Sequence, residues 1–248
     1  MKRNELMIIL MVAVTVMTAY TVMADPNIPA VLSQLSTSTR TIDGANKTND
    51  ALAGNLTEIA IDDTKVTQGW QGYYGNVSGT IVLDDALNNS MYTWDQSSAS
   101  GEIYASRNFS IDFSSGQIVC ANTANVSIEN TAIFPGTAGN DADNVTNTFS
   151  QTTHPEIVVG SNTITADSCS YTLSTYVDDA ADATRTFNET LLYSKNMNSI
   201  IYTAIIAQDA EGFKSGTDSH DFQMLVGEDG HSGDTATTTY YFYVELSA

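Results

Sequence analysis

Residues Thr238–Leu246 read TTYYFYVEL, and this stretch near the end of the 248-residue chain indicates the fold class most directly. Successive side chains of a β-strand point to opposite faces of its sheet. One face would carry Tyr240, Phe242, Val244 and Leu246, and the other Tyr241, Tyr243 and Glu245. The alternation predicts a final strand with one face on the core.

Short segments of the same kind recur along the chain. They are rich in Ile, Val, Thr, Tyr and Phe, and they are bounded by Asn, Asp, Gly or Ser, which is typical of strands and turns. The expected strands cover residues 79–84, 102–106, 109–113, 156–160, 170–176, 199–207 and 221–226. Residues 199–207 are apolar on both faces, which indicates a central strand. Helical periodicity is weak, so we predict an all-β domain: a β-sandwich with jelly-roll or immunoglobulin-like layering.

The first residues resemble an export signal. Lys2 and Arg3 precede an apolar run that ends in Val-Met-Ala before Asp25, a pattern that predicts a signal peptide over residues 1–24 with cleavage after Ala24. The alternative is an uncleaved leader that anchors the chain in the membrane. Both interpretations place the rest of the chain outside the cytoplasm.

The chain is strongly acidic, with a formal net charge of −20. Removal of Lys2, Arg3 and Glu5 with the leader takes away one net positive charge, which leaves −21. Nucleic acids and anionic headgroups are bound through lysine and arginine, which are scarce here. We therefore expect no nucleic-acid partner, and contact with a membrane only through an uncleaved leader.

The chain contains two cysteines, Cys120 and Cys169. An even pair in an exported chain predicts a disulfide, and unpaired buried thiols are the alternative. The bridge would close a loop of about 50 residues, which the chain-entropy model values at about 4 kcal/mol.

Between the leader and the first clear strand the sequence lacks a sustained period. Residues 25–49 are rich in Ser, Thr and Asn, with Ile28, Val31 and Leu35 as isolated apolar positions. We expect an N-terminal arm over residues 25–49 and a β-rich domain over residues 50–248. The arm could add as a strand to a neighbouring subunit, or it could be a disordered tether.

Asn-x-Ser/Thr triplets are frequent, and each is a potential glycosylation acceptor in an exported chain. The acceptor residues are Asn46, Asn55, Asn76, Asn88, Asn108, Asn125, Asn144 and Asn188. A chain this rich in Asn, Ser and Thr would contain several such triplets by composition alone, so unused triplets are the alternative.

The stretch GWQGYYGNVSG at Gly69–Gly79 combines aromatic residues with glycines. Stacking of sugar rings on Trp70, Tyr73, Tyr74 and also Trp94 is one interpretation. We favour the other, a structural corner closed by Trp70 and one tyrosine, because a glycan on Asn76 would cover a ligand platform.

Two blocks of the chain, residues 64–107 and 217–246, resemble a set of secreted surface proteins of archaea. The resemblance rests on WQGYYGNVSG, on the segment around Trp94 and on the terminal YYFYV strand. It implies an exported, glycosylated β-domain, and it implies no particular reaction.

Calcium is the cofactor that the composition favours, because oxygen-rich turns suit a hard cation. GEDGHSGD offers Glu228, Asp229 and Asp234 as weak candidate ligands; solvated turns are the alternative. The sequence contains no G-x-S-x-G, H-E-x-x-H or nucleotide-binding motif, and HSGD at His231–Asp234 lacks any mark of an oxyanion hole. We expect no enzymatic activity.

These features together predict an exported structural protein that self-associates as the subunit of a surface layer, sheath or filament. The alternative is a surface-displayed carbohydrate-binding or adhesion module that recognises cell-wall or surface glycans.

Overall fold

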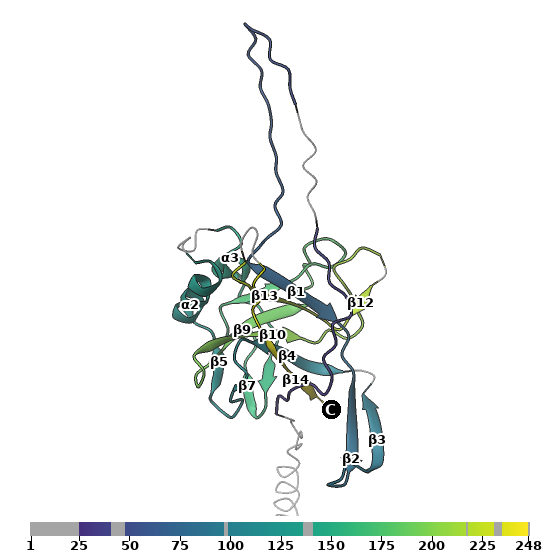
Figure 1. The fold of residues 1–248 in the computed structure, drawn as a ribbon. Helices are drawn as coiled ribbons and strands as arrows, with labels where there is room; N and C mark the ends of the chain where they lie inside the picture. Colours follow the sequence, from purple (N-terminus) through teal and green to yellow (C-terminus); the bar gives the residue numbers. More distant parts are fainter. Residues whose placement is uncertain are drawn as a thin grey trace, which may run out of the picture.

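The computed structural model describes residues 25–40, 48–96, 99–135, 141–216, 218–230 and 235–247. It is an all-β sandwich with two short helices at one side, as Figure 1 shows. The predicted leader lies outside the described residues.

The largest sheet has the strand order β14-β4-β10-β9-β5, and β8 also pairs with β9. All its pairings are antiparallel. The strands are β14 (Tyr241–Ser247), β4 (Ser100–Ser106), β10 (Ser199–Ile205), β9 (Asn188–Ser194), β5 (Ile118–Cys120) and β8 (Thr172–Ser174). Strand β10 lies in the middle and is buried along both faces, which confirms the central strand predicted from its sequence.

One face of this sheet is covered by the antiparallel pair of β1 (Trp70–Gly75) and β13 (Phe222–Gly227), together with helix α2 (Thr123–Ile133) and the short helix α3 (Val145–Thr148). Apolar residues from all these elements form the first core, which contains Val126, Phe149, Leu191, Tyr202 and Met224.

The opposite face is covered by the hairpin of β6 (Ile157–Val159) and β7 (Asn162–Ile164). Its second core includes Tyr104, Ile157, Leu192 and Ile201. The disulfide between Cys120 and Cys169 lies beside it and joins the end of β5 to the segment that leads into β8. The predicted bridge is therefore present, with the two Cα atoms 5.1 Å apart.

Two further hairpins lie outside these layers. One is formed by β11 (Ala210–Glu211) and β12 (Ser219–His220), and the other by β2 (Gly79–Asp84) and β3 (Ser90–Gln96). The β2–β3 hairpin projects from the body, and a long extended segment leaves the body at the opposite end (Figure 1).

The N-terminal segment is extended as expected, but its limits differ from the prediction. Asn27 is bonded to Val244 on the outer edge of β14, through N–H···O contacts of 3.0 and 2.8 Å. The described chain then stays exposed until residue 68, and at Thr67–Trp70 it joins the body again. We call the described residues of this segment, 28–40 and 48–66, the arm. The chain contacts the body at both ends of this segment, and the first described strand begins at Trp70.

Three other expectations need correction. Residues 109–113 form no strand, and the carbonyl of Phe109 accepts a hydrogen bond from the Tyr243 hydroxyl. Helices α2 and α3 were not predicted. Strand β14 has the predicted alternation, but both of its faces contact the protein interior. Tyr243 and Glu245 on one face are buried, and Phe242 and Val244 on the other face are half-buried.

Candidate functional site

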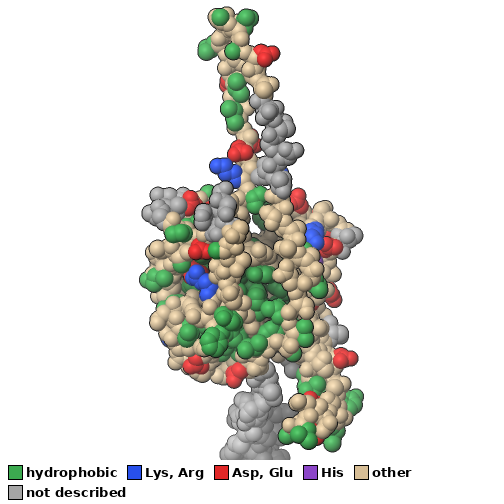
Figure 2. Space-filling view, in the orientation of Figure 1, with side chains coloured by type: hydrophobic (Ala, Val, Ile, Leu, Met, Phe, Trp, Pro, Cys, Tyr) green, Lys and Arg blue, Asp and Glu red, His purple; other side chains and the backbone are tan. Residues whose placement is uncertain are grey.

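Most of the exposed large apolar side chains of the described chain lie on two projections of the molecule. Figure 2 shows them there, and it also shows apolar side chains gathered on the body between the projections. On the arm they are Ile28, Val31, Leu32, Leu35, Leu52, Leu56, Ile59, Ile61 and Val66; on the β2–β3 hairpin they are Ile81, Val82, Leu83, Leu87, Met91, Tyr92 and Trp94. The arm residues Leu35, Leu56 and Ile61 are 94%, 102% and 89% exposed. Exposed apolar side chains gathered on one part of a molecule are typical of interaction sites.

The hairpin has one apolar face. Ile81 lies opposite Trp94, and Leu83 lies opposite Tyr92 in the antiparallel register. Directly opposed residues of antiparallel strands share a face, so these four side chains form one patch. The rings of Tyr92 and Trp94 are in contact, with centroids 4.8 Å apart.

A third apolar feature runs along the outer edge of β14. Tyr240, Phe242, Val244 and Leu246 pack against the first core but are only half-buried, whereas Tyr243 and Glu245 on the other face are buried. In the described part of the chain, the backbone groups on the outer edge of β14 form hydrogen bonds at Val244, and their partner there is Asn27. The first core is therefore incompletely covered along this edge, which we call the β14 seam.

The residues of the proposed aromatic platform do not form one surface. Trp70 donates its indole N–H to the carbonyl of Asp143 at 2.6 Å and packs against Phe149 and Tyr202. No ring contact among the described residues joins any two of Trp70, Tyr73, Tyr74 and Trp94. Tyr73 packs on Phe242, Tyr74 on Phe213 and His220, and Trp94 on Tyr92. Trp70 and Tyr73 are partly buried and packed against the first core.

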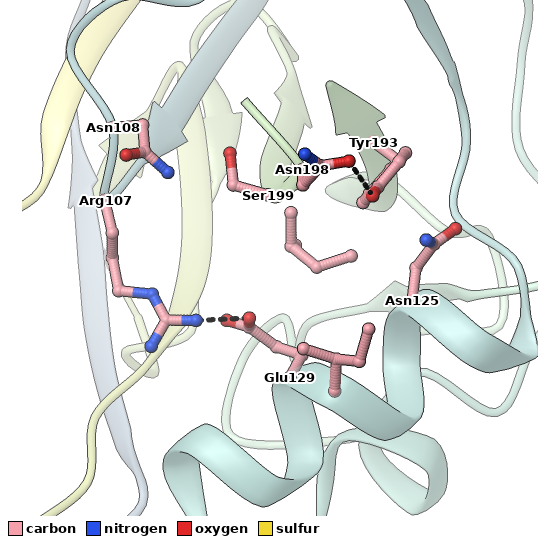
Figure 3. A pocket seen from close by; sticks show the side chains of 9 residues that line it. Arg107, Asn108, Asn125, Glu129, Tyr193, Asn198 and Ser199 are labelled. Carbon is pink, nitrogen blue, oxygen red and sulfur yellow. Dashed lines mark hydrogen bonds and ion pairs between the residues drawn. The ribbon is translucent and has the colours of Figure 1, made fainter. Parts of the chain in front are cut away.

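A polar pocket of about 200 Å³ lies between helix α2 and the turn from β9 to β10 (Figure 3). It is lined by Arg107, Asn108, Asn125, Ile128, Glu129, Tyr193, Asn198, Ser199 and Ile200. Amide and hydroxyl groups dominate the lining, and Tyr193 donates its hydroxyl hydrogen to Asn198 Oδ1 at 3.1 Å. Such groups can hydrogen-bond a small polar ligand such as one sugar ring.

The charged groups of this pocket neutralise each other. Glu129 of α2 is buried, forms an ion pair with Arg107, and accepts a hydrogen bond of 2.8 Å from the hydroxyl of Tyr202. Burial raises the pKa of Glu129, while the positive charge of Arg107 and the Tyr202 hydroxyl oppose that rise. Glu129 thus holds α2 against Arg107, which directly follows β4, and against Tyr202 of β10, and the ion pair carries no net charge.

The proposed calcium ligands are not assembled in the described part of the chain. Glu228 accepts a hydrogen bond from Thr238, Asp229 is exposed, and Asp234 lies outside the described residues. No group of three or more His, Cys, Asp or Glu side chains placed to hold a metal ion occurs among the described residues. Calcium therefore stays a prediction.

The potential glycosylation sites differ in accessibility. Asn55, Asn76 and Asn88 are exposed, Asn108 and Asn188 are half-buried, and Asn46 lies outside the described residues. Asn125 and Asn144 are buried, and their side chains accept backbone hydrogen bonds at the starts of α2 and α3. The folded chain thus does not offer Asn125 or Asn144 as an acceptor.

The histidines do not form a catalytic arrangement in the described residues. His154 is buried and accepts a hydrogen bond of 2.9 Å at Nε2 from the Cys169 N–H, while Nδ1 lies 2.6 Å from the Pro155 carbonyl. His220 packs on Tyr74, and the HSGD stretch lies outside the described residues. His154 therefore fixes the backbone next to the disulfide.

Buried carboxylates are the polar feature that the sequence interpretation missed. Glu102, Glu189 and Glu245 lie within strands of the main sheet and are 5%, 0% and 3% exposed. A glutamate inside an apolar strand is the only sequence signal for such a group, since burial of a carboxylate requires partners that the sequence does not reveal.

Comparison of the chain with family models, curated proteins and solved structures finds no match. The resemblance to archaeal surface proteins therefore stays a prediction. Within the described residues, no helix has the length and apolar character needed to span a membrane.

Proposed function

We propose that this protein is the exported subunit of an extracellular polymer, such as a surface layer, sheath or filament. The observation that carries the proposal is the concentration of exposed apolar side chains on the arm and the β2–β3 hairpin. A folded monomer leaves these side chains in water, where burial of each would gain about 1.5–3 kcal/mol. Association with other copies would bury them.

The positions of the projections favour head-to-tail contacts. The arm and the hairpin extend from opposite ends of the body (Figure 1). A contact that joins two different surfaces generates an open-ended polymer whenever the rotation between copies does not close a ring. Repetition of one arm contact would then give a directional filament or sheet.

The arm also has the form of a strand donor. It is extended, and Ile59 and Ile61 would share one face if it paired as a strand. The β14 seam offers a partly open core and an outer strand edge that the chain's own Asn27 occupies only at Val244. Strand addition at such an edge satisfies backbone groups and fills apolar positions together. We therefore place the arm of one copy along the β14 seam of the next.

Substitutions in the arm test this function. The variant Leu35→Ser, Leu56→Ser, Ile61→Ser removes apolar contacts from residues that touch little of their own chain, so we expect a folded monomer with an unchanged melting temperature. The intact mature protein should form filaments or sheets in sedimentation and negative-stain images. The variant should remain monomeric.

The control is Ile128→Ser, which removes an apolar side chain that is 65% exposed on the body instead of the arm. This variant should polymerise like the intact protein. If the intact protein and the arm variant both sediment as monomers under every salt condition, the polymer proposal fails. The alternative, a glycan-binding or adhesion module that uses the polar pocket beside α2, then becomes the better account.

A further inference from the structure

Strands β4 and β14 each place a glutamate on the same buried face. Glu102 and Glu245 are direct partners in the antiparallel register, and both are almost fully buried. Opposed side chains in such a register lie about 5 Å apart at Cβ, and like charges at these positions repel. The pair therefore needs a positive charge or a bound proton.

The hydrogen bonds of this pair are incomplete. Both carboxylate oxygens of Glu245 lie 3.0 Å from the backbone N–H of Gly160, and Glu102 Oε1 accepts from the Val158 N–H at 3.1 Å. The Tyr104 hydroxyl lies 3.2 Å from Glu245 Oε2. Glu102 Oε2 is buried without a hydrogen-bond partner among the described residues. Since an unsatisfied buried polar atom is costly, the site lacks a donor.

The local electrostatics favour neutralisation of the pair, by a proton or by a cation. Burial raises the pKa of Glu102 to about 7, and the charge of Glu245 adds to the rise. Burial also raises the pKa of Glu245, and the charge of Asp25 adds to it. The ion pairs found among the described residues are Arg107–Glu129 and Lys214–Asp218, and neither supplies a positive charge to this site.

The start of the described chain lies beside this pair. The backbone of Asn27 is bonded to Val244, the neighbour of Glu245, and Pro26 is buried. A Cβ atom on Gly160 would lie 2.5 Å from Asp25 Oδ1, so glycine at this position permits the close approach of Asp25. Only a few covalent bonds separate that oxygen from the backbone nitrogen of Asp25. Asp25 itself is exposed, so its nitrogen would reach Glu245 from the solvent side of the pair.

We propose that Glu102 and Glu245 form the binding site for the α-ammonium group that removal of the leader after Ala24 creates on Asp25. Hydrolysis of the Ala24–Asp25 peptide bond by the host's signal peptidase consumes one water and leaves a carboxylate on Ala24 and an ammonium on Asp25. The ammonium has three N–H donors and a positive charge, whereas the uncleaved amide has one N–H and no charge. The new group can satisfy Glu102 Oε2 and neutralise the pair.

Leader removal thus completes the fold at the β14 edge. The inference rests on the predicted cleavage site and does not depend on polymer formation, because the site is contained in one chain. It also gives a reason for the sequence position of the cleavage: a start one residue earlier or later would move the ammonium by about 3.8 Å along an extended chain.

Direct titration of the amino terminus tests the proposal. The mature chain, released from a fusion tag so that it starts at Asp25, is labelled for NMR at its α-amine. We expect the α-amino pKa to exceed the ordinary 7.7–8.0 by about one unit, because the carboxylates stabilise the charged form. Nα-acetylation of Asp25 should lower the melting temperature at pH 7 by about 5 °C.

The variant Glu102→Gln should reduce this acetylation effect to less than half. Glu156→Gln is the matched control, since Glu156 is exposed just before β6 and should leave the effect unchanged. An α-amine with an ordinary pKa and equal melting temperatures for the free and acetylated chains would overturn the proposal. Stabilisation of both chains by calcium, dependent on Glu102, would instead assign the pair to a metal ion. The titration of the unsubstituted chain needs no variant, so misfolding of Glu102→Gln would not prevent the test.

Discussion

Individual buried polar residues hold the layers of this sandwich together. Glu129 joins α2 to β4 through Arg107 and to β10 through Tyr202. Asp221 acts in a similar way, since its two carboxylate oxygens accept hydrogen bonds from the backbone N–H groups of Asp209 and Val77 at 2.9 and 2.6 Å. Each of these carboxylates connects segments that are distant in sequence, so its loss should affect global stability rather than one loop.

The Arg107–Glu129 pair gives an asymmetric prediction. Arg107→Met leaves a buried carboxylate without its cation, and we expect a loss of about 2 kcal/mol, less than for a fully buried pair because the Arg107 side chain is 32% exposed. Glu129→Gln keeps an acceptor for Tyr202 and leaves an arginine that can reach water, so the loss should be about 1 kcal/mol. Urea denaturation at pH 7 with equal m-values measures both. Equal losses would contradict this interpretation of the pair.

At the scale of elements, the disulfide fixes short strands that have few partners of their own. Strand β5 has three residues and pairs with β9, and Cys120 at its end is joined to Cys169 across a sequence separation of 49. Helices α2 and α3 lie within the closed loop, and α2 begins with a capping box in which Asn122 and Asn125 each accept the other's backbone N–H. The bridge therefore limits the unfolded freedom of the segment that contains both helices.

Replacement of both cysteines by serine should lower the free energy of unfolding by about 4 kcal/mol in the chain-entropy model. Denaturant titration of the double variant beside the oxidised protein measures the loss. Mass mapping without reduction should identify a peptide that joins Cys120 to Cys169. Recovery of both residues alkylated from the native, unreduced protein would contradict the bridge.

At the scale of the whole molecule, a strongly negative body carries apolar projections. The net charge of −20 opposes close approach of two copies, whereas burial of the arm and the β2–β3 hairpin would favour it. Salt screens the repulsion between exposed charges and leaves apolar contacts in place. Assembly should therefore depend on ionic strength.

Light scattering of the mature protein measures this dependence. We expect assembly to become faster as sodium chloride rises from about 10 to about 150 mM, because the Debye length falls from about 30 to about 8 Å. Calcium and magnesium at equal ionic strength separate screening from a specific site. If calcium alone raises the melting temperature, the prediction of a calcium site gains support through mass action on the folded state. Assembly that slows with added salt would contradict the screening argument.

The sequence by itself determined the features that depend on local pattern. Local composition and alternation identified half of the fourteen strands in the described chain: β2, β4, β6, β8, β10, β13 and β14. They missed the other half, including β9 in the centre of the main sheet. The continuous apolar run of β10 indicated its central place, since both its faces are covered. The two cysteines predicted their bridge because no other cysteine could pair with them.

Tertiary structure alone decided the features that depend on partners distant in sequence. The buried stripe of α2 includes Asn125 and Glu129 beside Val126 and Ile133, so the helix has no apolar period to detect. Those polar residues can be buried only because Asn122, Arg107 and Tyr202 satisfy them. The exposed segment extends beyond the predicted arm because a strand-like pattern is not sufficient to form a strand. Ile59 and Ile61 alternate like a strand but have no partner strand within the described chain, and β-pairing needs a second edge that a local sequence cannot supply.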